Sequence, residues 1–295
     1  MNSASRALRG DALSKSRAFR EGSENPWIFV TPSGDAAQSK AEAKGEKLAT
    51  RSVAEFSSKP RTLFLFIYPK NPQIMAYKLV CFDVDGTLIE NVKFSWQLFH
   101  DHFRIEPSKR EAGKRAFMKG DISYLQWAEH DVGLWKERKA TKQDFFDAID
   151  ANKVILIPGV RETLDELRSN GMKLAVISGS VNVMLERFIP DFEDVFDDVY
   201  LSRLLFDDAG IICGVNATQY DIEHKATALK LIAKRENIDL ADTVFIGDYL
   251  NDLHALQVAG LGIAFNSKMK EVKDAADISI DTKDMRDILP HILGK

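Results

Sequence analysis

The residues best suited to chemistry in this sequence are acids that directly follow short apolar runs. Asp83 and Asp85 come after the run at 79–82, and Asp248 comes one glycine after the run at 243–246. A carboxylate at the tip of a strand can attack phosphorus and form an acyl phosphate. A second acid close by can protonate the leaving oxygen and later deprotonate water. The spacing therefore predicts phosphoryl transfer, with Asp83 as the nucleophile and Asp85 as the general acid and base.

This chemistry needs a cation, because a carboxylate nucleophile and a dianionic phosphate repel each other. Mg²⁺ prefers oxygen ligands and is usually held by one or two carboxylates together with the substrate phosphate. The side chains of Asp83 and Asp248 and the main-chain carbonyl of Asp85 could hold the ion, which would neutralise charge during transfer. Mg²⁺ is therefore the predicted cofactor.

Other residues could hold the phosphoryl group. Lys225 opens a predicted helix and would place a point charge on a phosphoryl oxygen, unless it is simply an exposed lysine. Ser178 and the amide of Gly179 would bind phosphate at a helix N-terminus, although a Ser-Gly-Ser turn can also be a plain cap. Asn251 and Asp252 fit a loop-to-helix junction that orients the substrate, while Asp252 could equally be an acid stabilised by the helix dipole.

The elements that must position these residues alternate between short strands and helices. The strand-like apolar runs lie at 79–82, 174–177, 243–246, 261–265 and 278–280, and the helical stretches between them lie at 161–169, 223–236, 251–259 and 268–275. This alternation predicts an α/β fold with a Rossmann-like parallel sheet core. Ligands bind such sheets beyond the carboxyl ends of the strands. A hairpin is predicted over 204–213.

Residues from about 90 to 155 interrupt the alternation with aromatic residues at helical spacings. They predict three or four amphipathic helices that form a cap, with the aromatic side chains as the core of that cap. The predicted domains are therefore an α/β core over 75–90 and 156–295 and an inserted helical cap over 91–155. The six histidines lack ligand spacing, and we expect them at the surface or at helix caps.

The first 74 residues have a different composition, with 12 Lys and Arg against 7 Asp and Glu. We predict a disordered N-terminal extension that adds nothing to activity, with Met75 as a possible start. Four arginines among the first 20 residues leave open an organelle transit segment. The only two cysteines of the chain indicate a reducing compartment, hence the cytoplasm. The net charge of −4 and the lack of a long apolar run predict neither a nucleic-acid nor a membrane partner.

Taken in order, the segment 83–87, Ser178, Lys225 and the segment 247–252 resemble the motifs of the haloacid dehalogenase superfamily of phosphatases. The space for a cap after the first motif is similar to the phosphoserine phosphatase branch. The resemblance covers about residues 76–293 and implies a haloacid dehalogenase-like fold with an inserted helical cap. It implies the following site: Asp83 and Asp85 are catalytic, Asp83, Asp85 and Asp248 hold Mg²⁺, and Ser178, Gly179, Lys225 and Asn251 bind the substrate.

The sequence departs from that branch at two cap positions. Phosphoserine phosphatases use a cap glutamate and a cap arginine to bind the amino acid, where this chain has Val92 and Asp131, with Glu90 and Arg138 nearby but out of register. Because Val92 has no charge and Asp131 would repel a carboxylate, we expect phosphoserine not to be far better than other small phosphomonoesters.

The sequence therefore predicts a Mg²⁺-dependent phosphomonoester hydrolase that acts on a small phosphorylated metabolite through a phospho-aspartate. The alternatives are a phosphotransferase or mutase with an organic acceptor, and a signalling module that only accepts phosphate on Asp83. The second alternative is disfavoured, because such a module needs neither the acid Asp85 nor a cap.

Overall fold

The computed structural model describes residues 77–222 and 224–294, and the predictions made for residues 1–74 lie outside this range. Within it, no helix is long and apolar enough to cross a membrane. The strands are β1 (Leu79–Phe82), β2 (Ile89–Glu90), β3 (Ile155–Leu156), β4 (Lys173–Val181), β5 (Asp198–Phe206), β6 (Ile212–Asn216), β7 (Thr243–Gly247), β8 (Leu261–Phe265) and β9 (Ile278–Ile280).

The helices divide into two groups along the chain. Those between β2 and β3 are α2 (Ser95–His102), α3 (Pro107–Lys119), α4 (Tyr124–Glu137) and α5 (Lys142–Ala151). Those that follow are α6 (Val160–Ser169), α7 (Asn182–Phe188), α8 (Phe192–Val195), α9 (Lys225–Arg235), α10 (Leu253–Val258), α11 (Lys270–Ala275) and α12 (Leu289–Leu293), with short 3₁₀ turns at Leu240–Asp242, Leu250–Asp252 and Met285–Ile288.

The main sheet of the described residues has the strand order β6-β5-β4-β1-β7-β8-β9. All neighbouring strands are parallel except β5 and β6, which form the predicted antiparallel hairpin. The predicted α/β fold is therefore confirmed. The prediction missed the first part of β5, which runs parallel to β4, and the small β2–β3 ribbon at the base of the helical insertion.

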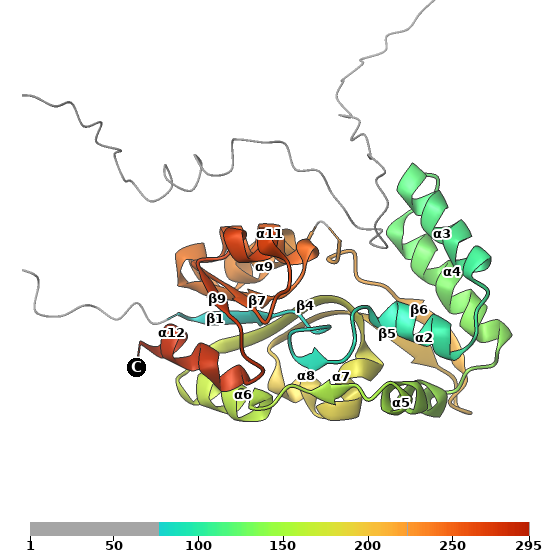
Figure 1. Cartoon of the computed structure of the whole chain (residues 1–295), viewed down its shortest axis with the longest axis horizontal. Coiled ribbons are helices and arrows are strands. Elements are labelled where there is room, and N and C mark those ends of the chain that lie inside the picture. Colours follow the sequence, from blue (N-terminus) through green and yellow to red (C-terminus); the bar gives the residue numbers. More distant parts are fainter. Residues whose placement is uncertain (1–76, 223, 295) are drawn as a thin grey trace, which may run out of the picture. The chain divides into compact units, whose positions relative to one another are not determined.

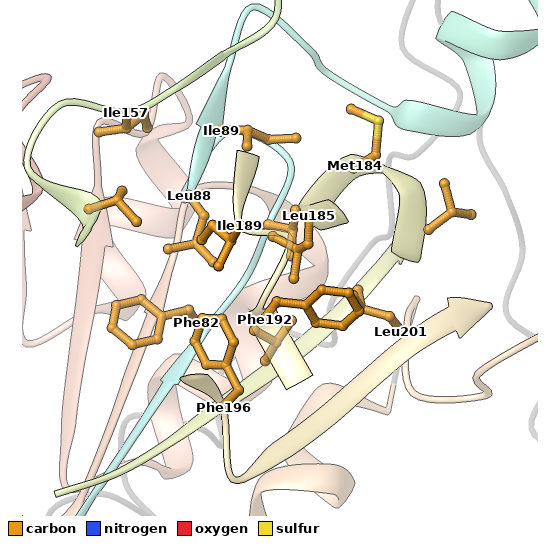
Figure 2. Close-up of a cluster of buried hydrophobic side chains, with 14 of the residues drawn as sticks. Phe82, Leu88, Ile89, Ile157, Met184, Leu185, Ile189, Phe192, Phe196 and Leu201 are labelled. Atoms are coloured by element: carbon orange, nitrogen blue, oxygen red, sulfur yellow. The ribbon is translucent and has the colours of Figure 1, made fainter. Parts of the chain in front are cut away.

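Both faces of the sheet are covered by helices, with α9 and α11 on one face and α6, α7 and α8 on the other (Figure 1). Strand β1 shows why its residues form a central strand: Val80 and Phe82 point into one apolar core, while Leu79 and Cys81 point into the other. Around Phe82, the α7 and α8 side chains close the first core (Figure 2). Their burial fixes the register of β1, and thereby the place where its acidic end emerges.

The aromatic side chains of the helical insertion pack on one another, but they are continuous with one core of the sheet and do not form the separate core that was predicted. Trp135 and Phe145 are fully buried, and their ring centroids lie 5.4 Å apart. Phe99 packs on both rings at 5.8 and 4.8 Å. His100 was expected at the surface or at a helix cap but is 1% exposed beside the Trp135 ring, so that expectation is wrong for this residue.

Candidate active site

Asp83 lies at the carboxyl end of β1, between β4 and β7. Its main-chain N–H donates to the carbonyl of Ile246 over 2.9 Å, which continues the β1–β7 ladder, and its side chain is buried. Three residues later Gly86 adopts a φ of +89°, and a Cβ at this position would overlap the Asp248 carboxylate. Glycine is therefore required at this turn on both counts, and the turn brings the first acidic segment against the end of β7.

Asp85 is held above the strand end by two serines. Its Oδ1 accepts a hydrogen bond of 2.6 Å from the Ser180 hydroxyl, and its Oδ2 accepts one of 2.7 Å from the main-chain N–H of Ser95 in α2. The pKa of Asp85 is raised to about 6, mainly by burial, with the Ser180 hydrogen bond opposing this effect and the nearby Asp83 adding to it. A carboxyl group with this pKa can both donate and accept a proton near neutral pH.

Lys225 is one of the most deeply buried charges in the described part of the chain. Its Nζ donates to Asp83 Oδ1 over 2.6 Å and to Asp252 Oδ1 over 2.7 Å, and the residue is 1% exposed. Burial alone would lower the pKa of Lys225, but the carboxylates of Asp252 and Asp83 raise it above its usual value. The interpretation of Lys225 as an exposed helix lysine is therefore wrong, and the ammonium group stays charged beside Asp83.

Asp252 is fully buried and fixes the loop that carries Asp248. Its Oδ2 accepts hydrogen bonds of 3.0 Å from the main-chain N–H groups of Asp248 and Tyr249, while its Oδ1 faces Lys225. Burial raises the pKa of Asp252 to about 6. The position thus has a structural role in this loop beyond that of an acid near a helix N-terminus.

Carboxylate oxygens of Asp83, Asp248 and Asp252 lie within 4.8 Å of one another and could hold a metal ion. Burial, then Asp83 and Asp252, raise the pKa of Asp248 well above its usual value, because three acids share a region from which water is largely excluded. A divalent cation would offset this repulsion. The Asp85 side chain lies outside this cluster, and its oxygens accept from Ser180 and Ser95 instead.

Ser178 and Gly179 lie in an irregular extension of β4 rather than at a helix N-terminus. Strand β4 continues to Val181, its register to β5 shifts between Ile177 and Val181, and α7 begins only at Asn182. The expectation of a phosphate site on a helix N-terminus is therefore wrong, because the chain stays extended through Gly179. The Gly179 carbonyl accepts a hydrogen bond of 2.9 Å from Trp96 Nε1 of α2.

Asn251 lies in the 3₁₀ turn between β7 and α10, as the predicted loop-to-helix junction requires. Its Nδ2 donates to Asp221 Oδ1 over 3.2 Å, and Asp221 Oδ2 accepts a 2.8 Å hydrogen bond from the Tyr124 hydroxyl of α4. Neither Asp221 nor Tyr124 belongs to a motif, so the sequence alone does not indicate this contact. Ser180 and Ser95 were also missed as partners of Asp85.

The residues at the two cap positions that depart from the resemblance make contacts within the protein. Val92 packs against the apolar core. Asp131 is 2% exposed and lies 3.1 Å from His100 Nε2 and 3.0 Å from His130 Nδ1. The nearby alternatives are also engaged: Glu90 pairs with Lys283, and Arg138 donates to the carbonyl of Arg104.

Comparison with known proteins assigns this chain to a family. The family model of haloacid dehalogenase-like hydrolases matches residues 77–260. The phosphoserine phosphatase of Methanocaldococcus jannaschii is 31% identical over 223 residues, which are 73% of this chain and 97% of that protein. The phosphoserine phosphatase of Saccharomyces cerevisiae is also 31% identical, with 76% of this chain and 70% of that protein covered. The chain is also 31% identical to the phosphoserine phosphatase of Mycobacterium tuberculosis, but it spans only about half of that protein's length, 47%.

Solved structures give the same result. A phospho-aspartyl intermediate analogue of phosphoserine phosphatase is 30% identical, covers 73% of this chain and 98% of its own, and superposes with a TM-score of 0.55. A substrate-bound phosphoserine phosphatase complex is 29% identical with the same coverage and a TM-score of 0.56. The chain therefore belongs to the haloacid dehalogenase-like hydrolases, as a phosphatase of the phosphoserine phosphatase-like branch.

Proposed function

We propose that Asp83 is the nucleophile of this phosphatase, that Asp85 is its general acid and base, and that Mg²⁺ is its cofactor. One observation carries the proposal: the Asp83 carboxylate lies buried at the end of the central strand, bonded to Lys225 and clustered with two further acids. Such a concentration of carboxylates around one lysine is unfavourable unless a ligand completes the charge balance. The substrate class that suits it is a small phosphomonoester together with a divalent cation.

In the proposed first step, Asp83 attacks the phosphorus atom and Asp85 protonates the departing oxygen of the ester. Ser180 and Ser95 hold the Asp85 carboxyl in place for this transfer. In the second step, Asp85 removes a proton from the water that attacks the phospho-aspartate. Because the pKa of Asp85 is about 6, both its protonated and its ionised forms are populated near neutral pH.

The phosphoryl group is assigned to Ser178, Gly179, Lys225 and Asn251. Lys225 supplies positive charge next to Asp83, and its deep burial keeps water from screening that charge. Ser178 is also buried, with its Oγ accepting a 3.2 Å hydrogen bond from the Ser180 main-chain N–H. That contact fixes the side chain beside the main-chain N–H of Gly179, which would bind a phosphoryl oxygen.

The proposed metal ligands are the side chains of Asp83 and Asp248 and the main-chain carbonyl of Asp85. The donor set is entirely oxygen, which suits Mg²⁺. When bound, Mg²⁺ neutralises charge on the phosphoryl group and on the acids around it. Thr87 donates to Asp248 Oδ1 over 3.2 Å and orients that carboxylate.

We also propose that 75–90 and 156–295 act as the core and 91–155 as a cap that covers the strand ends. The contacts of Trp96 with Gly179 and of Tyr124 with Asp221 support this division, since each joins the insertion to the strand ends. Cys81 and Cys213 are both unpaired, which supports a reducing compartment such as the cytoplasm.

The test is a hydrolysis assay over small phosphorylated metabolites with Mg²⁺ and with EDTA, followed by acid quenching with a ³²P-labelled substrate. We expect Mg²⁺-dependent release of phosphate and an acid-stable phosphoprotein that is absent in Asp83→Asn. Added alcohols should not divert the phosphoryl group from water. Phosphorylated alcohol as the main product would identify a phosphotransferase, and release of phosphate without a phosphoprotein would contradict the nucleophile assignment.

A further inference from the structure

The loop between β6 and α9 carries an acid that takes no part in the chemistry proposed above. Asp221 lies four residues before Lys225. Its Oδ1 accepts a hydrogen bond of 3.2 Å from Asn251 Nδ2, and its Oδ2 accepts one of 2.8 Å from the Tyr124 hydroxyl of α4. One carboxylate therefore joins a residue that we assign to the phosphoryl group with a residue of the helical insertion.

The contact with Asp221 fixes which way round the Asn251 amide lies. An ionised carboxylate only accepts hydrogen bonds, whereas an amide has a nitrogen that donates and an oxygen that accepts. Asn251 therefore turns its Nδ2 toward Asp221, because a reversed amide would bring two oxygens together. Nδ2 carries a second hydrogen that Asp221 does not use. Donated to a phosphoryl oxygen, it would let one nitrogen bridge two anionic groups that otherwise repel each other.

Tyr124 holds the other oxygen of the same carboxylate. The pKa of Tyr124 is raised well above its usual value, first by burial and then by the charge of Asp221, so the phenol keeps its proton and stays a donor. With Oδ2 bonded to Tyr124, rotation of the carboxylate is restricted and Oδ1 remains directed at Asn251. Because Tyr124 belongs to α4, this restraint depends on where the insertion lies.

Gly179 restrains the carboxylate as well. A Cβ added to Gly179 would overlap the carboxyl carbon and both oxygens of Asp221, so the acid packs directly against the main chain there. Asp221 thus contacts Gly179 and Asn251, two of the residues to which we assign the phosphoryl group, and is held by both neighbours and by Tyr124.

We propose that Asp221 is a positioning residue that turns the Asn251 amide so that an N–H faces the phosphoryl group, with Tyr124 of the insertion holding Asp221 in place. Asp221 itself touches no reacting atom and acts only through Asn251. The inference rests on the proposed function, because it takes Asn251 to bind the phosphoryl group. It makes the order of the phosphoryl site depend on the position of the insertion, whatever the leaving group of the substrate.

The test is a double-mutant cycle between Asp221 and Asn251, read as kcat/KM for p-nitrophenyl phosphate and n-propyl phosphate. Asn251→Ala should lower kcat/KM by about 10- to 100-fold, the effect of losing a hydrogen bond to a charged group. Asp221→Ala should lower it by about tenfold or more, because the amide is no longer held. In the double variant, kcat/KM should lie within about threefold of that of Asn251→Ala, since no amide is left to orient.

Two further variants separate orientation from charge and from the cap. Asp221→Asn should keep kcat/KM within about threefold of wild type, because its Oδ1 can accept from Asn251 and its Nδ2 can donate to the Tyr124 hydroxyl oxygen. Tyr124→Phe should lower kcat/KM by about fivefold and should have no further effect when added to Asp221→Ala. Losses in each variant should agree within about threefold for the two substrates, because both present the same phosphoryl group.

Asp147→Ala is the matched control. It removes an exposed contact of the same kind on α5, in which Gln143 Nε2 donates to Asp147 Oδ1 over 2.8 Å, and should leave kcat/KM unchanged. If Asp221→Ala does not fold, the cycle is measured with Asp221→Ser, whose side chain is also shorter.

Losses that multiply in the double variant would show that Asp221 does not act through Asn251 and would overturn the inference, with the proposed function intact. An equal loss in Asp221→Asn and Asp221→Ala would show that the charge of Asp221 matters instead of the orientation of the amide, and would also overturn it. Wild-type kinetics in Asn251→Ala would overturn the assignment of Asn251 to the phosphoryl group, and this part of the proposed function would fail together with the inference.

Discussion

The core and the cap each bury carboxylates, but they balance the charge in different ways. In the core, Asp83, Asp248 and Asp252 cluster, and Lys225 bonds to two of them. Burial, and after it the repulsion that remains, raise the pKa of Asp248. The core cluster is therefore a set of groups that a ligand would complete.

In the cap, the single carboxylate of Asp131 lies between two imidazoles. His100 Nε2 and His130 Nδ1 are 3.1 and 3.0 Å from its oxygens, and Trp135 Nε1 donates to His100 Nδ1 over 3.2 Å. Because Nδ1 accepts from Trp135, the His100 proton is on Nε2, toward Asp131. In this network, protein side chains lie against both oxygens of the acid. The difference between the two regions indicates which buried acids serve chemistry and which serve folding.

The largest expected effect is the loss of activity in Asp83→Asn. An amide cannot attack phosphorus, so kcat should fall more than about 10³-fold. The melting temperature should not fall, because the change removes one of three repelling acids and Lys225 keeps Asp252. Kinetic assay and thermal unfolding of the same preparation measure both, and residual activity above a few per cent of wild type would contradict the assignment.

Asp85→Asn should reduce kcat/KM, which reports the first step, by about 10²–10⁴-fold on alkyl phosphates, since it removes proton transfer to the leaving oxygen but leaves the nucleophile. Aryl phosphates should lose much less, because their leaving groups need no proton. A matched series of aryl and alkyl phosphates measures the difference. Equal losses on both classes would exclude the general-acid role of Asp85.

Asp131→Asn should lower the stability of the protein and leave its activity almost unchanged. It removes the charged acceptor that His100 and His130 contact, and the loss of a hydrogen bond to a charged group typically lowers the free energy of unfolding by about 1.5–3 kcal/mol. The rate per folded molecule should change less than about threefold. Denaturant unfolding and a rate measured below the unfolding transition test the two parts. A specific loss of rate with unchanged stability would bring Asp131 into the active site.

The metal-free protein should become less stable as the pH rises from about 4 to about 6. The folded-state pKa values of Asp85 and Asp252 are raised to about 6. The stability contributed by their protonated forms is fully present below their unfolded pKa values and is lost as the pH rises through the folded ones. Mg²⁺ should therefore raise the melting temperature more at pH 7 than at pH 5, relative to EDTA. The same increase at both pH values would argue against a metal at this cluster.

The smallest expected effect is that of Trp96→Phe, which removes the hydrogen bond to the Gly179 carbonyl but keeps an aromatic ring beside Trp135. A hydrogen bond of this kind contributes about 1 kcal/mol. KM should therefore rise about fivefold, with kcat within about twofold of wild type. Steady-state kinetics are sufficient, and an unchanged KM would mean that this contact does not help to form the substrate site.

The strands that carry the acidic motifs could be predicted because their signal is local. A short apolar run followed by an acid or a glycine specifies both a buried strand and its functional end, as β1 and β7 show. Asp221 could not be selected in this way. Its importance depends on contacts with Tyr124, 97 residues earlier, and Asn251, 30 residues later, and no period or motif in one sequence encodes that pairing.

The environment of a predicted residue was also harder to foresee than its position. Ser178 was expected to precede a helix, but β4 continues past it and brings Ser180 to Asp85 instead. His100 was expected at the surface or at a helix cap, because nothing in its local sequence shows that Asp131 and Trp135 will enclose it. Helical spacing indicates which residues share a face, but not which other face will cover them.

The central position of β1 also affects how the chain can fold during synthesis. Leu79 pairs with Lys173 on one side and with Thr243 on the other. During synthesis, β1 therefore stays unpaired until residues 94 and 164 positions later in the chain have been made. Pairing over such separations is slow, and an unpaired apolar strand is prone to aggregate in the meantime. A nascent chain that stops before β7 would leave one edge of β1 open and would lack Asp248 and Asp252. A truncated product of the ribosome would therefore be a substrate for chaperones before it could be a catalyst.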